Sequence, residues 1–186
     1  SMMPGTQIRF LTTTGTLLTR TIVATQSVAG AADVLLFALD SALPAEVIPV
    51  KLLPQNFATK APSVSTFFPV LNHEQAYTRC IAVNQFRRAG IMDWRGLDYS
   101  TFRAVTPSSH AITIASGDSG SPVFFRVGNQ LALIYCFFAA SGGVMLHTFT
   151  TAIATSISTM ETTLGLSAGT LGATVAIDLS AYPTYT

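Results

Sequence analysis

The stretch ASGDSGSPVFF, at 115–125, places a serine between two glycines and continues into an apolar run. Glycine permits backbone conformations that other residues rarely adopt, and Pro122 followed by Val-Phe-Phe is typical of the start of a packed strand. The turn makes Ser119 a candidate nucleophile. A seryl hydroxyl needs a base to take its proton and donors to stabilise the negative oxygen of a tetrahedral intermediate. The backbone N–H groups of Gly117 and Ser119 are the predicted donors.

The segment GDSGSP, at 117–122, resembles the nucleophile motif of chymotrypsin-like (trypsin-fold) serine proteases. It does not fit the α/β-hydrolase elbow, which requires glycine two residues after the serine, where this chain has Ser121. The resemblance implies a serine endopeptidase that hydrolyses peptide bonds through an acyl-enzyme on Ser119. Its partner would be a peptide or protein substrate, and it would need no cofactor.

A second segment, ADVLLFALDSALPAEVIPVKLLP at 32–54, is similar to the part of that family that carries the catalytic aspartate. There an aspartate opens an apolar strand, and a proline-punctuated loop follows. The resemblance implies that Asp33 orients the base, and Asp33 lies 86 residues before Ser119, near the roughly 93 residues between the same roles in chymotrypsin. Taken alone, Asp33 also fits a strand-opening or turn residue. Asp40, at the far end of the strand, is the weaker competitor.

The resemblance extends more loosely over about residues 6–166 and implies a substrate pocket. Thr113 to Ser116 would line the primary specificity pocket, and no aspartate stands at its base, so a preference for Lys or Arg is not supported. Phe137 and Phe138, close to the strand that walls the cleft, would narrow the pocket.

The histidine that this family needs is not where the family has it. The family's histidine precedes its aspartate by roughly 45 residues, whereas only 32 residues precede Asp33 and none is histidine. The three histidines, His73, His110 and His147, all follow it, and each also fits an ordinary loop or core position. A rearranged triad stays open, because triads are defined by geometry and not by order.

Three explanations of the missing base remain. The sequence is a fragment or an N-terminally clipped form; or the fold has lost catalysis and serves as a binding or structural module, for example of a viral or phage particle; or a partner supplies the histidine. Without the histidine, activity falls to about 10³–10⁴-fold over water, so the chain alone is expected to be nearly inactive. A first barrel without its opening strands exposes an edge, so we expect self-association or a complementing N-terminal segment.

The expected fold is all-β, a chymotrypsin-like double β-barrel with an incomplete first barrel and a C-terminal helix. Its predicted parts are a partial N-terminal barrel at 1–60, a C-terminal barrel plus helix at 61–166, and a tail at 167–186.

Local patterns place the elements within these parts. Strands are expected on both sides of Gly15, and a strand is expected to start at Asp33. A turn is expected near Gly90 and a hairpin at Gly128-Asn129. Apolar residues at helical spacing predict a helix over 150–165 that stops at Gly165, and His147 is expected on a strand. In the tail, ATVAIDLS could pair as an extra strand on an exposed edge. A C-terminus that occupies the cleft after self-cleavage is an alternative, but disorder or simple packing of the tail is favoured over it.

Composition excludes several function classes. Hydrophobic residues make up 49% and charged residues 10%, against about 25% charged in typical globular proteins, so the chain can bury a large core and expose neutral surface. The net charge of +1 gives no reason to expect nucleic-acid binding.

The apolar stretch at 131–146 is short for a membrane helix and is interrupted by Ser-Gly-Gly, so no membrane span is expected. Cys80 and Cys136 have no zinc-site spacing, so no metal is expected, and a single disulfide between them stays open.

Overall fold

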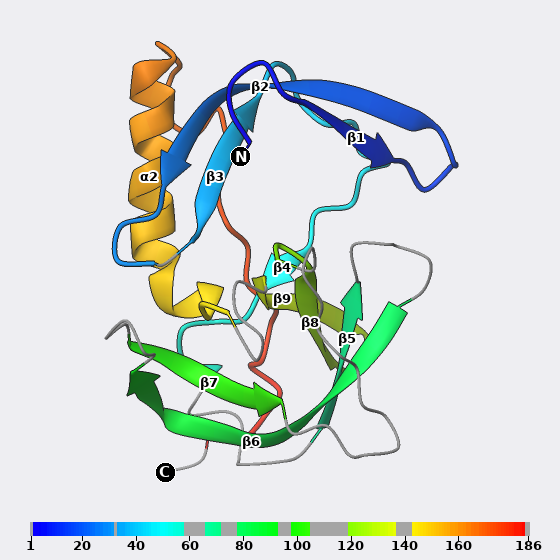
Figure 1. The fold of residues 1–186 in the computed structure, drawn as a ribbon, viewed down its shortest axis with the longest axis vertical. Helices are drawn as coiled ribbons and strands as arrows, with labels where there is room; N and C mark the ends of the chain where they lie inside the picture. Colours follow the sequence, from blue (N-terminus) through cyan, green and yellow to red (C-terminus); the bar gives the residue numbers. More distant parts are fainter. Residues whose placement is uncertain are drawn as a thin grey trace. The chain divides into compact units, whose positions relative to one another are not determined.

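The computed structural model describes residues 2–31, 33–57, 119–136 and 143–184 with their side chains, and the backbone of the strands at 66–71, 78–92 and 98–104. Strands in two sheets and one C-terminal helix make up most of this part of the chain (Figure 1). The predicted β-rich fold with a late helix is therefore confirmed. Among the described strands, the two edge strands of each sheet do not pair with each other, so no closed barrel is seen in this part of the chain.

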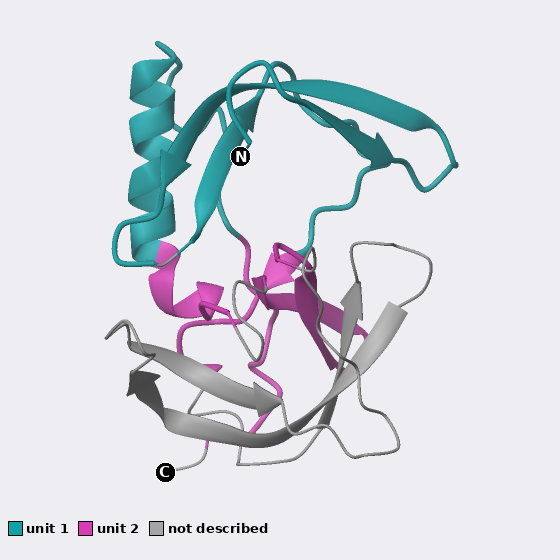
Figure 2. Cartoon of the chain, in the orientation of Figure 1, with its two compact units in different colours: residues 1–50, 151–174 teal, residues 51–150, 175–186 magenta. Residues whose placement is uncertain are grey.

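The chain divides into two compact units (Figure 2). Unit 1 comprises residues 1–50 and 151–174, and unit 2 comprises residues 51–150 and 175–186. The chain therefore passes between the units at three points in the sequence.

Unit 1 contains an antiparallel sheet of β1 (Gln7–Leu11), β2 (Leu17–Ser27) and β3 (Leu35–Leu39), in the order β1-β2-β3. Gly15, with φ of +83°, makes the predicted turn between β1 and β2. The Thr12 hydroxyl accepts a hydrogen bond from the Thr16 N–H at 2.9 Å, which closes this turn.

Helix α2 (Thr150–Thr163) confirms the predicted helix. Four of its threonine hydroxyls, at 155, 159, 162 and 163, donate to the carbonyl four residues earlier, which explains how a Thr-rich segment satisfies its polar groups in a helix. Gly165, with φ of +65°, ends it as predicted. The N–H of Leu166 reaches the Glu161 carbonyl and that of Gly165 the Thr162 carbonyl, the Schellman pattern.

The core of unit 1 lies between α2 and the sheet. Ala24 and Ala38 are cross-strand partners on the same face, and Met160 packs against both. Their small side chains allow the helix to approach closely. The Ser156 hydroxyl donates to the Ser27 carbonyl at 3.3 Å, which adds a polar contact between helix and sheet.

Unit 2 contains a six-stranded sheet in the order β4-β9-β8-β5-β6-β7. Its strands are β4 (Lys51–Leu52), β5 (Thr66–Leu71), β6 (Thr78–Met92), β7 (Asp98–Ala104), β8 (Pro122–Val127) and β9 (Gln130–Cys136). β4 pairs with β9 in parallel, and the other pairs are antiparallel.

Two expectations about this sheet have different outcomes. The hairpin is confirmed: Gly128, with φ of +58°, joins β8 to β9. The turn near Gly90 is wrong, because β6 runs on to Met92 and Gly90 pairs with Ser100; only the register with β7 shifts, between Phe86 and Gly90. Glycine there accompanies an irregularity in the ladder, not a reversal of the chain.

A glycine of ordinary backbone conformation is required in the core of unit 2. A Cβ at Gly143 would lie 2.0 Å from the Cys136 carbonyl oxygen and 2.7 Å from Cδ2 of Tyr135. The segment at 143–145 is almost fully buried and leads into the short 3₁₀ helix η2 (Leu146–Phe149), directly before α2. Close packing of backbone on β9 therefore fixes the entry to the helix.

The tail returns to unit 2 and pairs with β4. Ala176 forms a parallel bridge with Leu52, which confirms that this segment can add a strand to an exposed edge. None of the helices in the described residues has both the length and the hydrophobicity of a membrane span.

Candidate functional site

Ser119 lies in an exposed turn directly before β8. Gly120 has φ of +92°, a left-handed conformation that explains the glycine after the serine, and no atom of the described residues lies within 4 Å of the position that a Cβ would occupy there. Ser121, the next residue, is 7% exposed. The turn therefore leaves one serine at the surface and buries its neighbour.

The strand that follows this turn, β8, is held by neighbouring strands on both sides. It pairs with β9 on one side and β5 on the other, and Val123, which pairs with both Tyr135 and Val70, is 1% exposed. Pro122 stands at the first position of the strand, where the missing N–H costs least. Interior strands are among the most rigid parts of a fold, so Ser119 is attached to a well-supported element.

Asp33 is an exposed residue in the connection between β2 and β3. Its φ is +55°, and aspartate is one of the few residues that tolerate this left-handed region. The N–H of Val28 donates to the carbonyl of Val34 at 3.1 Å and closes the connection. The strand begins at Leu35, two residues later than expected, so the aspartate belongs to the turn.

Asp33 belongs to unit 1 and Ser119 to unit 2. Their convergence on a common groove stays a prediction.

Asp40, the competing aspartate, has a structural role. Its N–H donates to the Thr21 carbonyl at 2.9 Å and ties the end of β3 to β2. The backbone N–H of Thr21 holds the pKa of the Asp40 carboxyl below its usual value, helped by the hydroxyls of Thr21 and Ser41 and by the charge of Arg20. These partners account for the residue without a catalytic task.

His147 is the one histidine within the described residues. It lies in η2 and not on a strand as expected. It is 2% exposed, and its ring meets that of Phe57 edge-on at 6.1 Å between centroids. Burial lowers its pKa to about 4, and its Nδ1 atom has no hydrogen-bond partner.

This environment matches a neutral core histidine. A catalytic imidazole is normally oriented by a hydrogen bond that its second nitrogen donates, usually to a carboxylate, and among the described residues none is paired with Nδ1 of His147.

The remaining candidate residues lie outside the described part of the chain. They are Gly117 of the predicted oxyanion hole, the two other histidines, His73 and His110, and the predicted pocket residues Thr113, Ser116, Phe137 and Phe138. Their assigned roles stay predictions. Within the described residues, no group of three His, Cys, Asp or Glu side chains could hold a metal ion. Cys136 is a free thiol whose pKa is raised by burial.

One polar residue that the sequence reasoning missed is Gln130. Its side-chain amide donates a hydrogen bond to the backbone carbonyl of Asp178 in the tail and accepts one from the backbone N–H of the same residue. A glutamine at the start of a strand carries no sequence signal for such a contact, because its partner is 48 residues away.

Compared with protein-family models, with curated proteins and with solved structures, the chain matches none of them.

Proposed function

We propose that this chain is a serine endopeptidase of the chymotrypsin-like class, a double β-barrel with an incomplete first barrel, and that Ser119 is its nucleophile. The observation that carries the proposal is the position of Ser119: exposed, in a turn whose next residue is a left-handed glycine, at the start of a strand paired on both sides. A nucleophile must be accessible to substrate and yet be held by a rigid scaffold.

The chemistry follows from the residue types. The Ser119 hydroxyl oxygen attacks the carbonyl carbon of the peptide bond while an imidazole takes its proton, and the N–H groups of Gly117 and Ser119 stabilise the oxyanion. The imidazole then protonates the leaving amine, and the acyl-enzyme on Ser119 remains. Water, deprotonated by the same imidazole, releases the acid. Asp33 would hold the imidazole in orientation.

The imidazole is the part that this chain does not supply at the family's position. The buried, unpaired ring of His147 is a poor candidate. We therefore assign the base first to a complementing segment or a partner that brings a histidine next to Asp33. If the base comes from this chain, His73 and His110 are the candidates.

A second function, a non-catalytic binding or structural module on the same fold, is favoured by the apolar surface of unit 1. Large aliphatic side chains are exposed there, including Met3 at 60%, Leu11 at 70%, Leu17 at 58% and Ile48 at 71%. Leu11 and Leu17 are cross-strand partners, so these two exposed side chains are neighbours, and contiguous exposed apolar groups are typical of protein interfaces. A module of this kind would keep the serine turn without needing a base.

Labelling with a fluorophosphonate separates the two functions, because the reagent reacts with an activated serine. Because this chain is not expected to hold its own base, we expect little modification of Ser119 in the wild-type chain alone and clear modification once free imidazole is added. We expect the same of Ser121→Ala, whose altered serine is the buried neighbour, and no modification of Ser119→Ala in either case. Added free imidazole is expected to accelerate the labelling if the site lacks only its base. A folded wild-type chain that stays unlabelled with and without imidazole would contradict the endopeptidase and support the module.

A further inference from the structure

The C-terminal tail occupies the free edge of β4. The N–H of Leu52 donates to the Val175 carbonyl at 2.8 Å, and the N–H of Ile177 donates to the Leu52 carbonyl at 2.9 Å. β4 is the edge strand of the six-stranded sheet, so without the tail these groups of Leu52 would face solvent. The tail thus extends the sheet by one short parallel strand.

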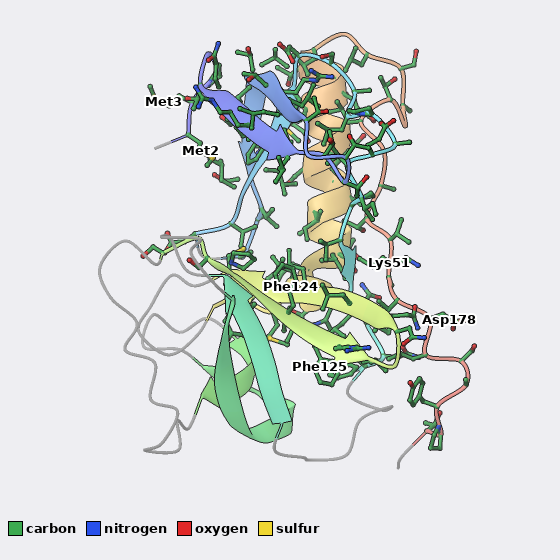
Figure 3. All side chains as sticks on the ribbon, turned by 90° about the vertical axis from the view of Figure 1, so that its right-hand side faces the viewer. Met2, Met3, Lys51, Phe124, Phe125 and Asp178 are labelled. Atoms are coloured by element: carbon green, nitrogen blue, oxygen red, sulfur yellow. The ribbon has the colours of Figure 1, made fainter. Side chains whose placement is uncertain are left out.

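Gln130 holds the next residue of the tail by its backbone alone. Its Nε2 donates to the Asp178 carbonyl at 2.8 Å, and its Oε1 accepts from the Asp178 N–H at 3.0 Å. The Asp178 side chain is exposed; its carboxylate accepts a hydrogen bond from the Ser180 N–H at 2.8 Å and is also attracted by the charge of Lys51 on β4. Lys51 of β4 and Asp178 lie along the same edge of the unit (Figure 3). Four hydrogen bonds therefore recognise an extended backbone without regard to sequence.

Alternate side chains of the tail supply the specificity. Ile177 is 2% exposed and Leu179 is 6% exposed, whereas Val175, of the same chemical class, is 59% exposed. Backbone pairing to a sheet edge combined with pockets for every second side chain is the way in which many domains bind extended peptides. The contacts of this tail are those of a bound peptide.

The connector between α2 and the tail is exposed apart from one residue. Residues 165–170 and 172–174 are exposed, and Gly165, Gly169 and Gly172 have positive φ, which glycine adopts at little steric cost. The connector is anchored at Leu171, whose N–H donates to the buried Glu161 carboxylate at 2.9 Å. The docked segment therefore begins only four residues after a fixed point.

We propose that the edge of β4, together with Gln130, is a docking site for an extended peptide with aliphatic residues two positions apart, and that residues 175–179 are its resident, displaceable ligand. The short connector keeps the tail at a high effective concentration, so the tail normally occupies the site. This site is separate from Ser119 and does not depend on the proposed peptidase activity.

The first test uses a chain that ends at Thr174 and a fluorescent peptide of residues 173–184. We expect saturable binding to the shortened chain, and binding to the full chain only at much higher peptide concentrations, because the tethered tail competes for the site. An Ile177→Thr peptide should bind at least about tenfold more weakly because it loses a buried aliphatic group. The matched Val175→Thr peptide should bind like the unchanged one, since Val175 is exposed.

Variants of the protein test the same site from the other side. Gln130→Ala should weaken peptide binding by about tenfold, whereas Gln26→Ala, in unit 1, should leave peptide binding unchanged.

A second measurement covers the case in which the shortened chain does not fold. A protease site placed within 167–170 of the full chain allows the tail to be cut after folding. We expect the cut tail to co-elute with the protein at high concentration, to dissociate on dilution and to exchange with labelled peptide. A folded shortened chain that binds no peptide, or a cut tail that never exchanges, would overturn the proposal and leave the tail as permanent packing.

Discussion

His147 lies in the core of unit 2 with its Nδ1 atom unpaired, and burial lowers its pKa to about 4 from an ordinary value of 6.5. In the unfolded chain the imidazole regains the ordinary value, so between pH 6.5 and 4 the unfolded state binds more protons than the folded state. The free energy of unfolding should therefore be independent of this group above about pH 7, fall as the pH drops below 6.5, and level off below 4. We expect a loss of roughly 2 kcal/mol by pH 5.

The measurement compares urea unfolding of the wild-type chain and His147→Leu at pH 7.5, 6 and 5. The leucine variant lacks the titrating group, so its free energy of unfolding should change less over this range. Working at pH 5 and above limits interference from carboxylates such as Asp40, whose pKa lies below its usual value. If the two proteins lost the same stability on acidification, the buried neutral state of His147 would be refuted.

The packing of α2 on its sheet is the element-scale feature with the clearest energetic consequence. Met160 is 4% exposed and contacts the cluster of Ala24 and Ala38. Because these alanines cannot fill the space, Met160→Ala should leave a cavity and lower the free energy of unfolding by about 2–5 kcal/mol. Thr159→Ala, one position away on the exposed side of the helix, should cost less than about 1 kcal/mol. Chemical unfolding followed by circular dichroism measures both, and equal effects would show that the helix does not depend on this contact.

Local sequence signals were enough for the elements that depend on neighbours in the chain. The β1–β2 turn needs Gly15, the β8–β9 hairpin needs Gly128, and α2 follows from apolar spacing with a glycine stop at Gly165. Each requires only residues within a few positions of one another. The β-rich fold with a late helix could therefore be predicted.

Other features could not be predicted, because they depend on contacts between distant segments. β4 has only two residues. It is a strand because it pairs with β9 and with the tail, and not because of a pattern in its own sequence. The amide of Gln130 finds Asp178 through tertiary packing. His147 was expected on a strand and lies in a 3₁₀ helix, where the close approach of Gly143 to Cys136 fixes the chain.

Of the candidate site, the sequence predicted the local serine turn but not the relation between its distant residues. The serine turn is a local motif, and its exposure and its left-handed glycine agree with the expected accessible nucleophile. The role of Asp33 depends on a meeting of two units, and its left-handed conformation is equally well explained by the turn between β2 and β3. A motif of six residues specifies its own turn, whereas a triad requires the placement of whole segments.

At the scale of the whole molecule, charge does little to keep copies apart. The net charge is +1 and only 10% of the residues are charged, so electrostatic repulsion between molecules is weak at neutral pH. Short-range apolar contacts should then decide association. The tip of the β1–β2 hairpin presents such contacts, because Leu11 and Leu17 are cross-strand partners that are 70% and 58% exposed.

We therefore expect the chain to self-associate through this hairpin. Sedimentation velocity over a range of concentrations should show reversible oligomers, and Leu11→Ser combined with Leu17→Ser should weaken association at least about tenfold, since two large aliphatic groups no longer leave water in the complex. Stability should change little, because both side chains are exposed. Leu131→Ser, which removes a 43% exposed leucine from unit 2, should associate like the wild type. A wild-type chain that is monomeric at every concentration, or a double variant that associates unchanged, would show that the hairpin is not the contact, because Leu11 and Leu17 are the leucine pair that this ladder exposes.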